Sequence, residues 1–117
     1  SPLPVVQVHL DPQRLSRLFY NLVNNAVEEM PRGGLITLRA RVQGDELVTE
    51  VSDTGRGIAP EIAQRLFEPF ATHGKQHGTG LGLSICKKII EDQGGKISAH
   101  SAPGQGATFR FTLPLTR

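Results

Sequence analysis

The sequence predicts an α+β fold, a two-layer α/β sandwich in which one mixed, mainly antiparallel sheet is covered on one face by three helices. Alternating and three-to-four-residue apolar patterns follow one another in the order strand, helix, two strands, helix, long loop, helix, two strands. Each helical segment is apolar along one side only, which suits a single layer packed on a sheet. The 117 residues are enough for one domain, spanning residues 1–117.

The first predicted elements are a strand and a long helix. Residues 5–10 alternate and are rich in valine, which favours a strand. Asp11 and Pro12 are typical of a helix N-cap and first helical position. Apolar residues then recur at helical spacing until Met30, and Pro31 follows. We therefore expect a helix over residues 12–30.

The middle of the chain predicts a strand pair, a short helix and a long loop. Residues 35–42 and 46–53 read as strands joined by a tight turn. A short helix is expected over residues 60–67. Residues 68–80 show no periodicity and are rich in glycine and polar residues, so we expect a long flexible loop with a functional role.

The last third predicts one helix and two strands. The helix covers residues 82–93 and ends at Gly94, a typical C-terminal cap. Residues 96–102 and 107–115 read as strands around a proline- and glycine-containing turn. These strands complete the predicted sheet.

Composition excludes several classes of protein. Thirteen Lys and Arg residues against eleven Asp and Glu give a net charge of +2, and their scatter does not indicate a nucleic-acid or membrane partner. No apolar run approaches the roughly 20 residues that span a bilayer. The single cysteine, Cys86, has no internal partner, which favours a reducing, cytoplasmic location.

Gly78, Gly80 and Gly82 stand at alternate positions where a helix begins. Helix starts offer unpaired N–H groups, and glycines let phosphate oxygens approach them, so the pattern predicts a phosphate site. The spacing matches neither a Walker loop nor a dinucleotide-binding fingerprint, and the protein-kinase signatures are absent.

Four motifs in a fixed order resemble a known family. Residues 21–26 (NLVNNA), 53–57 (DTGRG), 67–70 (FEPF) and 78–83 (GTGLGL) resemble the N box, first glycine box, F box and second glycine box of the catalytic ATP-binding domain of sensor histidine kinases. That domain belongs to the GHKL superfamily shared with gyrase and Hsp90, which has the Bergerat ATP-binding fold. Residues 25–30 (NAVEEM) look like the nitrogen-regulation and PAS-linked branch.

The resemblance implies ATP and Mg²⁺ as cofactors, with the long loop as an ATP lid. Asn25 would give an oxygen to Mg²⁺ and Asn21 would line the same wall. Asp53 would accept a hydrogen bond from the adenine amino group, with glycines beside it and Ile58 in an apolar floor. The implied nucleotide-binding residues are Asn21, Asn25, Asp53, Gly55, Gly57, Ile58, Lys75, Gly78, Thr79, Gly80, Leu81 and Gly82.

Asn25, Asn21 and Lys75 are the implied catalytic residues. Lys75 is preferred over His73 and His77 for reaching the γ-phosphate, because its charge does not change near neutral pH.

The sequence departs from common patterns of the family at several positions. Glu28 and Glu29 replace a lysine and an aromatic residue, so stacking on adenine from this helix is not expected. Ala107 stands where threonine is frequent, and Thr108 should point to the opposite face of the sheet.

The predicted function is that of a protein-histidine kinase domain, which transfers the γ-phosphate of Mg-ATP to a histidine on a separate dimerisation domain, for relay to a response-regulator aspartate. The phosphoacceptor and sensor domains are expected outside residues 1–117, and the full-length kinase is expected to be a homodimer. Hydrolases of the superfamily carry a general-base glutamate where this chain has Asn21, and an amide cannot take a proton.

Two alternatives stay open: a GHKL-type ATPase or Ser/Thr protein kinase, and a non-catalytic nucleotide-binding interaction module. An aspartic protease, suggested by the triplet at 53–55, is contradicted by the helices and by Arg56.

Overall fold

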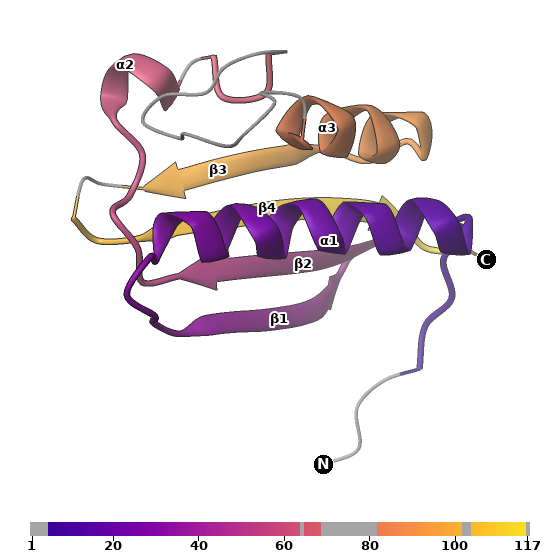
Figure 1. Ribbon diagram of the computed structural model, residues 1–117. Helices are drawn as coiled ribbons and strands as arrows, with labels where there is room; N and C mark the ends of the chain where they lie inside the picture. Colours follow the sequence, from indigo (N-terminus) through magenta and orange to yellow (C-terminus); the bar gives the residue numbers. More distant parts are fainter. Residues whose placement is uncertain (1–4, 64, 69–81, 102–103, 117) are drawn as a thin grey trace.

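The computed structural model describes residues 5–63, 65–68, 82–101 and 104–116 (Figure 1). Its elements in chain order are α1 (Pro12–Glu29), β1 (Ile36–Gln43), β2 (Glu46–Asp53), α2 (Pro60–Ala63), α3 (Gly82–Asp92), β3 (Ile97–Ser101) and β4 (Ala107–Pro114). Helix α1 begins as the sequence predicts, because the Asp11 side chain accepts a hydrogen bond from the Gln13 N–H and Pro12 occupies the first turn.

The four described strands form one sheet in the order β1-β2-β4-β3. All three neighbouring pairs are antiparallel, where a mixed, mainly antiparallel sheet was expected. The physical reason is that β1–β2 and β3–β4 are hairpins, which can only pair antiparallel, and β2 and β4 also meet in opposite directions. Asp53 stands beside Ile36 on one side and Ala107 on the other, so the ends of three strands meet there.

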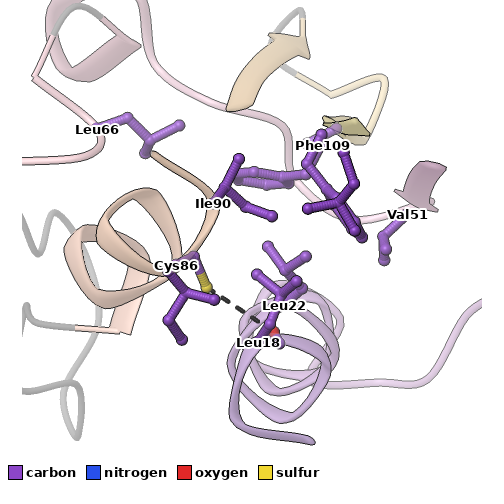
Figure 2. Packing of buried hydrophobic residues seen from close by; sticks show 11 residues of the cluster. Leu18, Leu22, Val51, Leu66, Cys86, Ile90 and Phe109 are labelled. Carbon is purple, nitrogen blue, oxygen red and sulfur yellow. Dashed lines mark hydrogen bonds between the residues drawn. The ribbon is translucent and has the colours of Figure 1, made fainter. Parts of the chain in front are cut away.

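Helices α1 and α3 cover one face of the sheet (Figure 1). Alternate residues of β4 point into this layer, and Phe111 meets Phe19 of α1 edge to face at 5.8 Å. Short helix α2 adds Ile62 to the same core. The buried core residues, several of which Figure 2 shows, are Leu18, Leu22, Val51, Leu66, Cys86, Ile89, Ile90, Ala107, Phe109, Phe111 and Leu113.

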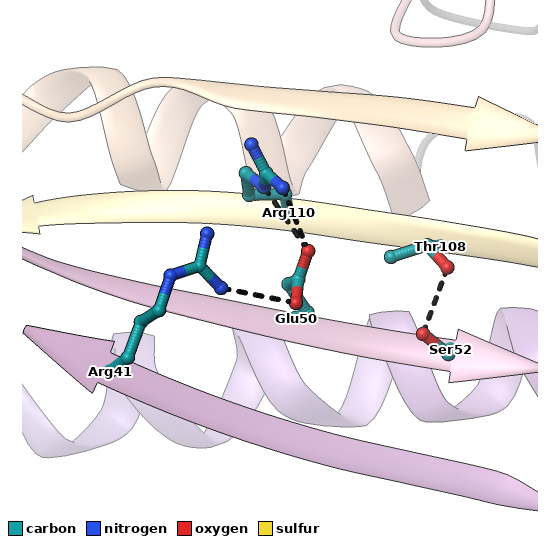
Figure 3. Close-up of polar contacts among 5 residues, drawn as sticks. All are labelled: Arg41, Glu50, Ser52, Thr108 and Arg110. Atoms are coloured by element: carbon teal, nitrogen blue, oxygen red, sulfur yellow. Dashed lines mark hydrogen bonds and ion pairs between the residues drawn. The ribbon is translucent and has the colours of Figure 1, made fainter. Parts of the chain in front are cut away.

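The other face of the sheet is polar (Figure 3). The Glu50 carboxylate accepts hydrogen bonds from Arg110 Nε at 3.2 Å and Nη2 at 3.0 Å, and from Arg41 Nη1 at 3.3 Å. The Arg110 guanidinium holds the pKa of Glu50 below its ordinary value. The Ser52 and Thr108 hydroxyls lie 2.8 Å apart, which confirms that Thr108 faces away from the helices while Ala107 is buried beneath them.

The predicted strand over residues 5–10 is wrong. Those residues form no strand, and Val5 is 94% exposed. Val8 and Leu10 pack against the core, but among the described residues only one backbone hydrogen bond joins this segment to the C-terminal segment, from the Thr116 N–H to the Gln7 carbonyl. Alternation alone therefore does not make a strand without a neighbour that continues the ladder.

Two helices end earlier than predicted. Helix α2 is four residues long and is followed by turns instead of continuing to residue 67, and α3 ends at Asp92. No helix in the described ranges is long and apolar enough to cross a membrane.

Candidate functional site

Asp53 is the buried acidic group at the end of β2. It is 7% exposed, and its Oδ1 accepts hydrogen bonds from the Gly55 N–H at 2.9 Å and the Ala107 N–H at 3.3 Å. Among the described residues, no group donates a hydrogen bond to Oδ2. Two backbone amides thus fix the carboxylate through one oxygen, and the other oxygen can accept from a ligand.

The loop after Asp53 packs directly on the last turn of α1. A Cβ on Gly55 would lie 2.6 Å from the Glu29 carbonyl oxygen, so only glycine fits. Gly57 has a φ of 81°, a left-handed conformation that also favours glycine. The Arg56 side chain lies over the same turn of α1, with Nε 3.3 Å from Glu29 Oε2. The glycine motif therefore has a structural reason in addition to its predicted role with a nucleotide.

The same loop is held by the β3–β4 hairpin. The Ile58 N–H donates to the Ser101 hydroxyl at 2.8 Å, and that hydroxyl donates to the Gly106 carbonyl at 2.5 Å. The Gly104 N–H donates to the Arg56 carbonyl at 2.6 Å. Ser101 and the Ala107 amide were not predicted as contributors, because their roles depend on the pairing of distant strands.

The two predicted asparagines lie on the side of α1 that approaches α3. Asn25 is 8% exposed, and Asn21 is half-buried. The Asn21 Nδ2 donates to the Gly82 carbonyl at a long 3.4 Å, and a Cβ on Gly82 would lie 3.8 Å from the Asn21 side chain. Helix α1, which carries the predicted N box, therefore contacts the start of α3, which carries the predicted second glycine box.

Cys86 of α3 is buried in the core, and its thiol is not a reactive group. Its Sγ donates to the Leu18 carbonyl at 3.8 Å (Figure 2), and burial raises the pKa of the thiol to about 12. A thiol that stays protonated near neutral pH is a poor nucleophile. Cys86 is a core residue, as its position on the apolar side of the helix predicts.

The structure describes seven of the twelve predicted nucleotide-binding residues, namely Asn21, Asn25, Asp53, Gly55, Gly57, Ile58 and Gly82. They lie in the C-terminal half of α1, at the end of β2 and in the loop after it, and at the start of α3. The other five, Lys75, Gly78, Thr79, Gly80 and Leu81, lie outside the described residues, as do His73 and His77. The described ranges hold no group of three or more His, Cys, Asp and Glu side chains able to bind a metal ion.

A family model described as histidine kinase-, DNA gyrase B-, and HSP90-like ATPase matches residues 10–117. The chain belongs to this ATPase family. The relatives that it resembles include proteins named as sensor kinases. The chain is 44% identical over 110 residues to the alginate biosynthesis sensor protein KinB of Pseudomonas aeruginosa, covering 93% of this chain and 18% of KinB. It is also 44% identical over 110 residues to the sensor histidine kinase ZraS of Klebsiella oxytoca, covering 93% of this chain and 24% of ZraS. The chain therefore spans less than a quarter of the length of either relative.

Solved structures of the ATPase family have the same architecture. The nucleotide-free catalytic domain of histidine kinase ThkA superposes with a TM-score of 0.79 at 38% identity, over 92% of this chain and 70% of that domain. Full-length ShkA in complex with AMPPNP superposes with a TM-score of 0.83 at 33% identity, over 97% of this chain and 24% of ShkA. The predicted α+β fold, one sheet covered on one face by helices, is confirmed, and the described sheet is entirely antiparallel.

Proposed function

We propose that the chain is the ATP-binding catalytic domain of a two-component sensor histidine kinase. It binds Mg-ATP and transfers the γ-phosphate to a histidine on a separate helical dimerisation domain, for relay to a response-regulator aspartate. The observation that carries the proposal is Asp53, a buried carboxylate with one oxygen fixed by the Gly55 and Ala107 amides and one oxygen left to accept from a ligand. The names of KinB and ZraS support the sensor-kinase assignment.

Asp53 gives the proposed site its preference for adenine. A carboxylate oxygen accepts the hydrogen bond that the exocyclic amino group of adenine donates. Guanine has a carbonyl oxygen at that position, which would face the negative charge and be repelled. The rejection is strong because the carboxylate is buried, and an unpaired buried charge is costly.

Asn25 fits the metal that this reaction needs. Mg²⁺ prefers oxygen ligands and keeps several waters, so it is commonly bound by one or two protein oxygens together with phosphates. The amide oxygen of Asn25 is such a ligand, and its neutrality leaves the charge balance to the phosphates. Bound there, Mg²⁺ would neutralise charge on the transferring phosphoryl group.

Asn21 argues for transfer to a nucleophile and against hydrolysis. Its amide cannot act as a general base towards water, and in this structure it donates to the Gly82 carbonyl. Asn21 thus positions the start of α3, where the Gly82 backbone belongs to the proposed phosphate site. A histidine acceptor brings its own lone pair, so positioning and charge stabilisation are enough.

The remaining residues of the proposed site follow from the resemblance alone. Lys75 would reach the γ-phosphate, and the Thr79 hydroxyl would hold the phosphates with the backbone of Gly78, Gly80 and Leu81. The proposed partners are the phosphoacceptor domain of the same homodimeric kinase and its response regulator, in the cytoplasm. The similarity of residues 25–30 to the nitrogen-regulation branch belongs to the same proposal.

Phosphotransfer tests the proposal. The chain is mixed with the phosphoacceptor hairpin of its own kinase and with ATP labelled at the γ-phosphate, with and without Mg²⁺. We expect label on the hairpin that is lost in acid and kept in base, as for phosphohistidine, and no label with Asn25→Ala. Acid-stable label, or release of phosphate without labelling, would instead support a Ser/Thr kinase or an ATPase.

A further inference from the structure

Strand β1 is an edge strand whose helix-facing side carries exposed apolar residues. In the described sheet β1 pairs with β2 alone, so its second backbone edge is free. Leu38 is 56% exposed and Val42 is 38% exposed. Helix α1 packs over β2 and leaves β1 at the margin of the helical layer (Figure 1). A free edge beside an uncovered apolar face is suited to receive another strand.

Helix α1 also carries exposed apolar residues, but on the side turned away from the sheet. Tyr20 is 68% exposed and Val27 is 52% exposed, and both lie opposite the buried residues of the helix. The exposed apolar residues beside the free edge are therefore those of β1 itself, and we call Leu38 and Val42 the β1 surface.

The opposite side of β1 is basic. Arg39 and Arg41 alternate with the apolar residues and point away from the helices. Arg41 bonds Glu50 at 3.3 Å, whereas Arg39 makes no ion pair with a described residue. Glu50 is shared with Arg110, so one carboxylate serves two guanidinium groups on this part of the sheet. An added strand would meet positive charge on this side and apolar side chains on the other.

A second copy of β1 does not fit these charges in the register that overlaps the two strands most fully. A symmetric antiparallel pair centred on Ala40 would keep Leu38 and Val42 on one face, but it would put Arg39 of each copy opposite Arg41 of the other. Like charges directly opposite each other destabilise a strand pair. A segment that carries acidic residues between apolar ones would satisfy both faces of the strand.

We propose that the free edge of β1 binds an extended acidic segment of a partner polypeptide, which adds a strand to the sheet. Apolar residues of the segment pack on the β1 surface, and the acidic residues between them pair with Arg39 and Arg41. This interaction does not depend on nucleotide binding, since none of its residues belongs to the proposed ATP site.

The test uses two end-blocked peptides, one of four Val-Glu repeats and one of four Val-Lys repeats, titrated into the isotope-labelled 117-residue chain. We expect the amide signals of residues 36–43 to shift most, and the Val-Glu peptide to bind at least about tenfold more tightly than the Val-Lys peptide. Arg39→Glu should abolish that preference, because the new carboxylate offsets the remaining charge of Arg41. Leu38→Asp should weaken the binding of the Val-Glu peptide at least about tenfold.

Both positions are exposed, so both variants should keep their fold and nucleotide affinity, and unchanged circular dichroism and AMPPNP binding verify this. The proposal is overturned if the Val-Glu peptide does not bind, if both peptides bind equally, or if the shifts lie elsewhere, such as on β3. Concentration-dependent dimerisation abolished by Leu38→Asp would also overturn it, in favour of a second copy.

Discussion

Arg56 Nε lies 3.3 Å from Glu29 Oε2, and this ion pair joins the loop after β2 to the last turn of α1. Glu29 is the last residue of α1, and Arg56 lies between the two glycines of the loop. The pair therefore links the two segments that provide Asn25 and Asp53. It offers a way to test how the loop is positioned without changing a residue proposed to touch the nucleotide.

Arg56→Ala should weaken AMPPNP binding about threefold and lower the free energy of unfolding by at most about 1 kcal/mol, because Arg56 is largely exposed. Calorimetric titration and urea unfolding measure the two effects. Arg41→Ala is the matched control, since it breaks an ion pair with Glu50 on the polar face of the sheet. An equal loss of affinity in both variants would argue against a positioning role for Arg56.

Gly55→Ala should lower the free energy of unfolding by about 2–4 kcal/mol, because the new Cβ would collide with the Glu29 carbonyl 2.6 Å away. Gly33→Ala is the control. Gly33 has a φ of 89° with no atom within 4 Å of the new Cβ, so its replacement should cost only the conformational penalty of about 1–2 kcal/mol. Chemical denaturation compares them, and a cost for Gly55→Ala no larger than that for Gly33→Ala would contradict the close approach.

Asp53→Asn should weaken ATP binding about a hundredfold, or about 2.7 kcal/mol. Asparagine can still accept from the Gly55 and Ala107 amides through one oxygen, but it turns an NH₂ group towards the adenine amino group. Affinity for GTP should fall less or rise. Competition between ATP and GTP measures the change, and Asp92→Asn at the C-terminal end of α3 is the control. If the ratio of the affinities for ATP and GTP did not change, Asp53 would have no role in recognising the base.

The buried thiol of Cys86 should make the free energy of unfolding fall at alkaline pH. The pKa of the thiol is about 12 in the folded protein against an ordinary value of 9.0. Burying the neutral thiol therefore contributes its full stability below pH 9. This stability is lost as pH rises from 9 towards 12, because the thiol of the unfolded chain ionises first. From pH 8 to pH 10 the chain should lose about 1.4 kcal/mol more stability than Cys86→Ala. Urea unfolding of both proteins at the two pH values isolates this difference from other titrating groups. Parallel pH profiles would show that the thiol ionises freely in the folded state.

The elements predicted well are those determined by local sequence. Helix α1 has its cap and apolar spacing within one segment, and the β1–β2 hairpin has its turn between two alternating runs. Residues 5–10 show where local sequence fails as a predictor. Their alternation is typical of a strand, but they form none, because no described strand pairs with them. Strand pairing is decided by distant parts of the chain, and a single sequence does not reveal it.

In the candidate site, too, local motifs predict some residues, whereas others depend on how distant strands pair. Asn25 and Asp53 could be predicted because their motifs are short and keep a fixed order. The Ala107 amide that fixes Asp53, and the Ser101 hydroxyl that holds Ile58, depend on the register of β4 with β2 and β3. The Arg56–Glu29 pair joins residues of two motifs, and neither residue alone indicates the contact.

Calorimetric titration of the 117-residue chain with AMPPNP, in the presence and absence of Mg²⁺, tests the proposed ATP site most directly. We predict one-to-one binding in the micromolar range or weaker that strengthens with Mg²⁺. In Asn25→Ala the magnesium dependence should disappear while magnesium-free binding persists, and in Asp53→Ala both should be lost. Absence of binding at millimolar AMPPNP, or affinity that neither substitution changes, would contradict the assignment of this site to Mg-ATP.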